Sequence, residues 1–214
     1  MRAHTPDATR QNLLKAAFDE IYRVGFQAAS LSEIVRHSGL TKGALYHHFP
    51  NKHALGLAVI DEVIQERLAT AVFQPLQNAQ DPLAALLQIL EDRARTRDED
   101  TIRCGCPLNN LVQEMSPVDH EFRHHLAAIL ARWQTVLHEA LSGAQRQGTL
   151  RADVDCEGAA LFMVAAWEGC WGIAKNRQSA GVFRQCMWQL RDYVRTLSRP
   201  APSDTKTSTR RTSS

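Results

Sequence analysis

The chain has 214 residues, of which 44% are hydrophobic and 22% are charged, and these proportions are ordinary for a soluble globular protein. No apolar run approaches the roughly 20 residues that a membrane-spanning helix needs, and the polar first residues lack the apolar core of a signal peptide. The net charge is only +2, but residues 1–60 carry seven Lys and Arg against four Asp and Glu. We therefore expect a cytoplasmic protein that spans no membrane, needs no cofactor, and has a mildly basic first part suited to a phosphate-bearing partner.

The first fifty residues have the pattern of three short helices. Apolar residues recur at helical spacing in the first helix, and Gly25 suits the left-handed turn that would end it. Ser30 and Glu33 have the spacing of a capping box, which predicts that a second helix begins there. Gly39 interrupts this helix after one or two turns, and Thr41 is placed to cap the third helix. Two short helices joined by a tight glycine turn are typical of a helix-turn-helix unit.

The third helix divides into an inner and an outer face. Leu45 and Phe49 lie four residues apart and are expected to be buried against the first two helices. The outer face is then basic and aromatic, and it has Gly43 where the backbone must come close to a groove. That geometry fits a helix in the DNA major groove, although a small hairpin with a solvated basic face would give the same composition. The side chains left on the outer faces are Lys42, Ala44, Tyr46, His47 and His48.

Helical periodicity continues through the rest of the chain, with no convincing strand pattern. The tail from 199 to 214 is rich in Ser, Thr and Arg, and it is predicted to be disordered. Further helices are predicted from about Asn51 to Phe73, from Asp81, from Cys106 to about Met115, from Asp119 to about Ser142 with Gly143 closing it, from Asp155 to Asn176, and from about Ala180 to Leu197.

Four short stretches of the first 60 residues together form a recognisable signature. They are Gly25-Phe26, then Ser30-Leu-Ser-Glu-Ile34, then Gly39-Leu-Thr-Lys-Gly-Ala-Leu-Tyr-His-His-Phe49, and then Asn51-Lys52. This signature resembles the DNA-binding headpiece of the TetR/AcrR family of repressors, and the resemblance covers nearly all of the first 60 residues. It implies an all-α fold, with a three-helix helix-turn-helix DNA-binding headpiece over residues 1–50 and a six-helix effector-binding and dimerisation domain over residues 51–198.

The resemblance also implies a function. A homodimer would bind a palindromic operator in double-stranded DNA and would be released from it by a small-molecule effector. Leu31 departs from the family pattern, where Thr or Ser is common, and its side chain offers no hydrogen bond to a phosphate. The DNA contacts that carry over are Ser30, Thr41, Lys42, Gly43, Tyr46, His47 and Lys52.

The segment from Arg103 to Met115 is the other unusual part of the chain. Five cysteines are an odd number, which argues against disulfides, and Cys106 stands just before a predicted helix with Arg103 near it. Both features favour a thiolate that could react with electrophiles or oxidants, and the competing interpretation is two small, buried or half-buried thiols at a helix start. The segment resembles a Gly-Cys-Pro-Leu-Gly-Asn-Leu pattern in the family branch that includes NemR-like and AcuR-like repressors, with Asn109 in place of the last Gly.

The nature of the effector stays open at this stage. It is either a reactive electrophile or oxidant sensed at Cys106, or an apolar ligand held without a covalent bond. A metal site that combines Cys104 and Cys106 with His120, His124 and His125 is a weaker alternative, and we expect no metal. The candidate effector or redox residues are Cys104, Cys106, Asn110, Trp133, Trp167 and Glu168, with Phe122 and Met163 as further candidates for an apolar wall.

Two further expectations concern the assembly and the class of protein. The apolar helix from Asp155 and the helix from Ala180 are expected to form a four-helix interface with a second subunit, as the family resemblance implies. A small helical enzyme is the competing class, but the chain has no spaced nucleophile and base, no phosphate loop and no dinucleotide fingerprint.

Overall fold

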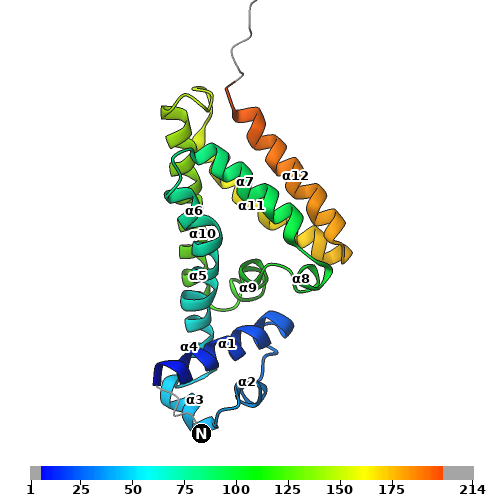
Figure 1. Cartoon of the computed structure of the whole chain (residues 1–214). Helices are drawn as coiled ribbons and strands as arrows, with labels where there is room; N and C mark the ends of the chain where they lie inside the picture. Colours follow the sequence, from blue (N-terminus) through cyan, green and yellow to red (C-terminus); the bar gives the residue numbers. More distant parts are fainter. Residues whose placement is uncertain (1–5, 200–214) are drawn as a thin grey trace, which may run out of the picture.

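The computed structural model describes residues 6–199, and within that range the chain is helical with no strand (Figure 1). The predicted all-α fold is therefore confirmed. The predicted disordered tail lies almost wholly outside the described residues.

Three helices at one end of the molecule form the headpiece. They are α1 (Pro6–Val24), α2 (Leu31–Ser38) and α3 (Lys42–His48). Leu45 and Phe49 are buried with α1 and α2, as predicted from their spacing. Gly25 and Gly39 have φ angles of 85° and 68°, so both end a helix in the left-handed conformation that favours glycine.

A long helical rod leads away from the headpiece (Figure 1). It consists of α4 (Lys52–Ala58), the π-helical segment Val59–Ile64, α5 (Gln65–Leu68), a second π-helical segment Ala69–Phe73, and α6 (Gln74–Gln77). The helix predicted from about Asn51 to Phe73 is thus present and extends one turn further. α10 (His120–Arg146) runs beside this rod.

The remaining long helices pack into a bundle. α7 (Pro82–Thr96) lies against α12 (Ala180–Leu197), and α11 (Cys156–Arg177) lies against both α12 and α10. Two short helices, α8 (Glu99–Cys104) and α9 (Pro107–Met115), occupy the space between this bundle and α1 (Figure 1). α9 is therefore the element placed between the bundle and the headpiece.

Most of these helices begin where the sequence supplies a side-chain oxygen for a free backbone N–H group. Such an oxygen accepts a hydrogen bond from the third residue after it, which satisfies one of the unpaired donors at the helix start. This local rule explains why most of the predicted helix starts are correct. The capping residues are Thr41, Asn51, Asp81, Asp98, Asp119, Asp155 and Ser179.

Three expectations about helix ends need correction. Ser30 precedes α2 but its side chain makes no capping hydrogen bond, and Glu33 instead accepts hydrogen bonds from Arg36, so the predicted capping box is absent. Gly143 does not close α10, which continues to Arg146 because the surrounding apolar residues stay buried. α8 was not predicted from the periodicity, since it has only six residues.

A tight contact joins the headpiece to the rod and to α10. The rings of Phe26 and Phe122 lie 4.5 Å apart, and Gly56 of α4 packs directly against both of them. A Cβ atom on Gly56 would lie 2.5 Å from Phe26 and 2.7 Å from Phe122, distances that the rings could accommodate only by moving. His53 and Asp119 make a 3.0 Å hydrogen bond beside this contact.

We predict that Gly56→Ala destabilises the fold despite the better helix propensity of alanine. Overpacking of this kind typically costs about 1–3 kcal/mol, against roughly 1 kcal/mol gained from propensity. Urea denaturation at fixed protein concentration measures the difference. Gly43→Ala is the matched control, because its Cβ would meet nothing closer than 3.7 Å and stability should not fall. Equal stability of both variants would contradict the packing account.

Candidate functional site

The outer face of α3 presents the side chains that the sequence predicted. Lys42 and His47 are exposed, and the Tyr46 side chain is 54% exposed although it is large and aromatic. Gly43 has no side chain within 3.7 Å of the position that a Cβ would take, so the backbone of α3 is open to close approach. The Thr41 hydroxyl oxygen accepts a hydrogen bond from the Ala44 N–H group, which leaves its own proton available to a phosphate oxygen.

Two other predicted DNA contacts are partly engaged within the headpiece. The Lys52 ammonium donates to the backbone carbonyl of Gln27 at 2.9 Å and lies 4.9 Å from the centre of the Phe26 ring. Burial of this ammonium lowers its pKa. Lys52 therefore helps to hold the α1–α2 loop as well as offering its remaining donors. Ser30 is half-buried and its hydroxyl is not used as a cap.

The loop between α1 and α2 is bound to α9. The Glu114 carboxylate of α9 accepts hydrogen bonds from the backbone N–H groups of Phe26 at 2.9 Å and Gln27 at 2.8 Å. One turn before the end of α1, the Tyr22 hydroxyl donates to the backbone carbonyl of Gly105 at 2.6 Å. Hydrogen bonds near both ends of α9 therefore join this helix to the same part of the headpiece. We call these contacts the α9 dock.

A cavity of about 350 Å³ lies above the α9 dock, between the rod and the α7, α8, α9, α10 and α11 helices. We call it the inner cavity. Its walls combine tryptophan and aliphatic side chains with a small number of polar groups, which is the usual make-up of a small-molecule site. The lining residues are Tyr22, Ile64, Arg67, Leu68, Ala71, Arg93, Arg97, Thr101, Gly105, Cys106, Pro107, Leu108, Trp133, Trp167, Glu168 and Trp171.

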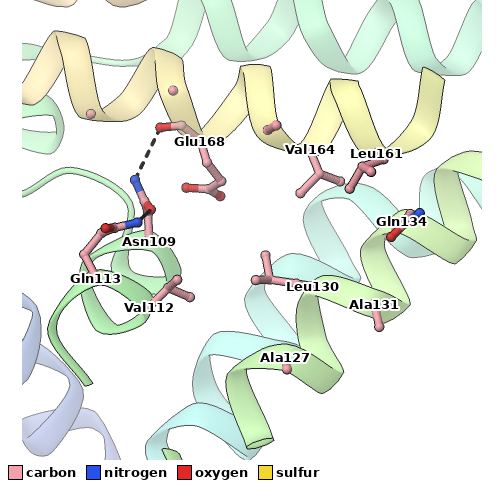
Figure 2. A pocket seen from close by; sticks show the side chains of 13 residues that line it. Asn109, Val112, Gln113, Ala127, Leu130, Ala131, Gln134, Leu161, Val164 and Glu168 are labelled. Atoms are coloured by element: carbon pink, nitrogen blue, oxygen red, sulfur yellow. Dashed lines mark hydrogen bonds between the residues drawn. The ribbon is translucent and has the colours of Figure 1, made fainter. Parts of the chain in front are cut away.

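A second, more open space of about 750 Å³ lies between α9, α10 and α11, and we call it the outer groove. Figure 2 shows Leu130 of α10 facing Val164 and Leu161 of α11 across it. Asn109 of α9 donates a hydrogen bond to the backbone carbonyl of Glu168 at 3.3 Å at one end of the groove. Glu168 lines both the groove and the inner cavity, so it stands at the boundary between them.

Glu168 and Cys106 form a hydrogen-bonded pair in the wall of the inner cavity. The Cys106 Sγ atom donates to Glu168 Oε1 at 3.4 Å. Burial raises the pKa of Glu168 to about 7. Burial and the adjacent carboxylate together raise the pKa of Cys106 well above its ordinary value. Near neutral pH the thiol is therefore protonated.

Of the two readings of Cys106 that the sequence leaves open, its surroundings favour the structural thiol over the thiolate. Arg103, which was expected to stabilise it, forms an ion pair with Asp100 at 3.2 Å instead. The helix start of α9 does favour a negative charge, but removal of the thiol from water outweighs that effect. Cys106 is a half-buried thiol in the wall of the cavity.

The other predicted effector residues divide into two groups. Trp133 and Trp167 line the inner cavity with Glu168, and their rings meet edge to face at 5.3 Å. Cys104 and Asn110 line a separate recess, where the Asn110 amide donates to the Cys104 carbonyl at 2.8 Å and accepts from Lys175 at 2.9 Å. These two residues therefore support the turn before α9 and do not face the inner cavity.

The remaining candidates for an apolar wall lie in the core. Phe122 and Met163 are fully buried and line neither the inner cavity nor the outer groove. Over residues 6–199, no group of three or more His, Cys, Asp or Glu side chains could hold a metal ion. The alternative of a metal site built from Cys104, Cys106 and nearby histidines is therefore not supported.

Comparisons with known proteins identify the two parts of the chain. Residues 13–59 match the family described as bacterial regulatory proteins, tetR family, and residues 82–188 match the tetracyclin repressor-like C-terminal domain. The chain belongs to the TetR family.

Individual TetR-family relatives agree with this. The chain is 32% identical over 168 residues to the transcriptional regulator AcuR of Cereibacter sphaeroides, which covers 77% of this chain and 76% of that protein. It is 26% identical over 191 residues to the HTH-type transcriptional repressor DhaR of Mycobacterium sp., covering 85% and 90%.

Solved TetR-family structures have the same fold. A regulatory protein TetR from Rhodobacter sphaeroides has 28% identity and a TM-score of 0.76, covering 86% of this chain and 97% of that one. The reduced form of E. coli NemR has a TM-score of 0.77 at 19% identity, covering 89% of this chain and 97% of that one, and this likeness concerns the fold alone.

Membership of the TetR family makes the protein a DNA-binding transcriptional regulator, and it excludes the competing class of a helical enzyme. Among the described helices, none is both long and apolar enough to cross a membrane.

Four polar residues of the inner cavity and the α9 dock were not predicted from the sequence. Arg93 lies in the last turn of α7, Arg97 is the extended residue that follows this helix, and both line the inner cavity. Their four-residue spacing near the end of a predicted helix was a usable signal, since residues at that spacing on a helix lie on one face. Tyr22 and Glu114 form the α9 dock, but their partners lie 83 and 88 residues away and no local pattern indicates them.

We predict that Glu114→Ala opens the α9 dock selectively. Loss of the carboxylate leaves two backbone N–H groups without their partner, at a cost of about 1–3 kcal/mol. Amide hydrogen exchange measured by NMR should become faster at Phe26 and Gln27, while amides in α12 keep their protection. Gln113→Ala, an exposed neighbour on the same helix, is the control and should leave both amides protected. Unchanged exchange in Glu114→Ala would contradict the dock.

We also predict that Glu168 makes stability fall as the pH rises. In the unfolded chain the carboxyl ionises near 4.5, whereas burial raises its folded pKa to about 7. As the pH rises between these two values, the carboxyl loses its proton in the unfolded state but keeps it in the folded state. The free energy of unfolding therefore falls by up to about 3 kcal/mol, and it stays level at pH values above the folded pKa. Glu168→Gln should flatten the decline between pH 5 and pH 8 in urea denaturation. Glu157→Gln, at an exposed position on α11, should not, and an equal slope in all three proteins would contradict this account.

Proposed function

We propose that the protein is a dimeric repressor that binds a pseudo-palindromic operator and is released by a small molecule bound in the inner cavity. The observation that carries the proposal is the position of α9. Cys106, Pro107 and Leu108 at its start line the cavity, and Glu114 near its end holds the α1–α2 loop. A nine-residue helix is about 13 Å long and is stiff, so a displacement at one end is passed to the other.

The DNA side of the proposal rests on α3. Tyr46 and His47 are large exposed side chains that can contact base edges and phosphates, and Lys42 can neutralise a phosphate. In a dimer with two-fold symmetry, two such helices enter successive major grooves, and an operator of matching symmetry follows. The proposed contacts are Ser30, Thr41, Lys42, Gly43, Tyr46, His47 and Lys52.

The dimer interface is proposed on α11 and α12. Leu161, Phe162 and Ile173 are large apolar residues of α11 with about half or more of their area exposed. A shallow apolar recess joins the two helices beside them, and exposed apolar area of this kind is typical of a protein interface. The recess is lined by Phe162, Ala166, Cys170, Gln185, Cys186, Gln189, Leu190 and Tyr193.

The release mechanism that these observations favour is non-covalent. Cys106 is protonated and hydrogen-bonded to Glu168, so reaction of the thiol with electrophiles is slow relative to an activated cysteine. A ligand in the inner cavity that prefers a different position of α9 would instead shift the dimer towards a state with altered headpiece spacing. Differential binding of a few kcal/mol is enough to relieve repression.

We predict that Tyr46→Ala lowers operator affinity by at least about tenfold, which corresponds to roughly 1.4 kcal/mol, without changing the dimer or the fold. The side chain is exposed, so the fold does not depend on it. Selection of duplexes from a randomised DNA library supplies the operator, and fluorescence anisotropy then measures affinity for wild type and variant. Light scattering monitors the dimer.

The salt dependence of binding and the symmetry of the selected DNA site test the same proposal. Lys42→Ala should reduce the slope of log affinity against log salt by about one, because it removes a single phosphate contact. The selected site should also have two-fold symmetry. Selection that yields no sequence preference, or a Tyr46→Ala variant with unchanged affinity, would contradict the proposed operator binding.

A further inference from the structure

Three polar atoms in the wall of the inner cavity lack a partner. Arg97 Nε, Trp133 Nε1 and Glu168 Oε2 are buried, and none of them has a hydrogen-bond partner within residues 6–199. All three residues line the inner cavity. Buried polar groups are almost always hydrogen-bonded, so three exceptions in one cavity indicate that the cavity is completed by a ligand with polar atoms.

The charge of the cavity indicates the sign of that ligand. Arg93 in the last turn of α7 and Arg97, the extended residue that follows this helix, are half-buried, and neither forms an ion pair with a carboxylate of the described residues. Arg93 donates to the backbone carbonyl of Ala71 at 3.1 Å, whereas Arg97 lies 5.8 Å from the centre of the Trp171 ring. Two neighbouring guanidinium groups without an acid partner repel each other, and a bound anion would relieve that cost.

Arg67 adds a third cation to the lining, and Glu168 is the single acidic side chain in it. Glu168 opposes an anion only weakly near neutral pH, because burial raises its pKa to about 7 and keeps much of it protonated. A protonated carboxyl also supplies an O–H donor. The polar part of the lining therefore consists mainly of donors.

The rest of the lining sets the size and character of the ligand. Trp133 is 1% exposed, and Trp133, Trp167 and Trp171 form a largely aromatic wall. A volume of about 350 Å³ lies near the lower end of the range for small-molecule sites. An extended or polyanionic ligand fits neither this volume nor this wall.

We propose that the effector is a small monocarboxylic acid with an apolar body, bound with its carboxylate on the Arg97 guanidinium and the Trp133 N–H group and its body against the tryptophan wall. This inference rests on the proposed function, since it names the chemical class of the ligand for the same cavity. Arg93, in the last turn of α7, contributes a second positive charge, and Cys106 and Leu108 place α9 within reach of the ligand's body.

The test compares acids with their uncharged amides. Benzoate, phenylacetate and hexanoate are titrated against the full-length dimer beside benzamide, phenylacetamide and hexanamide, with tryptophan fluorescence and melting temperature as readouts. At least one acid should quench the fluorescence and raise the melting temperature, and its amide should bind at least about tenfold more weakly. Equal binding of an acid and its amide, or no response to any of the acids, overturns the proposal.

Matched variants locate the carboxylate. Arg97→Gln should lose about 10- to 100-fold in affinity for the acid, as expected for the removal of a charged hydrogen bond. Arg95→Gln is the control, because Arg95 lies two residues before Arg97, is exposed, and pairs with Glu91 outside the cavity. Trp133→Phe keeps most of the ring but removes the N–H donor, so it should lose several-fold in affinity even if Arg97→Gln folds poorly. Unchanged acid affinity in Trp133→Phe and in folded Arg97→Gln overturns the assignment.

Operator release is measured separately on the selected duplex. Acid binding without release would contradict the proposed function but leave the ligand class standing. Release by an uncharged ligand that binds the same cavity, with no binding of acids, would contradict the ligand class alone.

Discussion

The Glu114 carboxylate accepts two backbone hydrogen bonds from the loop between α1 and α2, at 2.9 and 2.8 Å, and the proposed coupling between the cavity and the headpiece depends on this contact. The Lys52 ammonium also donates a hydrogen bond to this loop, at the Gln27 carbonyl. The Tyr22 hydroxyl donates to the Gly105 carbonyl, just before the start of α9. Because close-packed elements move between discrete arrangements rather than deforming continuously, α9 cannot shift without moving the headpiece or breaking these bonds.

The inner cavity lies where a bound ligand would contact the start of α9. A folded core rarely retains unpaired polar atoms and adjacent guanidinium groups, because each costs stability. Arg97, Trp133 and Glu168 retain such atoms in one cavity, and this cavity is closed by the start of α9. Locally destabilising features of this kind are concentrated at functional sites. In this protein they lie near the start of α9, whereas the contact with the headpiece lies near its end.

The sequence was a good guide wherever a short-range rule decides the structure. Caps at Asp81, Asp119 and Asp155, together with the left-handed turn at Gly25, are local, and these helix boundaries were predicted closely. The surroundings of Cys106 could not be predicted, because its hydrogen-bond partner Glu168 lies 62 residues further along the chain. The α9 dock and the inner cavity were not predictable for the same reason: tertiary packing brings their residues together, and no periodicity records it.

The central claim is that α9 transmits occupancy of the inner cavity to the DNA-binding helices. The most direct measurement is the ratio of operator affinities without and with a saturating cavity ligand, compared between wild type and Glu114→Ala under the same salt conditions. The account predicts that the ligand weakens operator binding clearly in wild type and that most of this effect is lost in Glu114→Ala. An equal ratio in the two proteins, with ligand affinity unchanged, would contradict it.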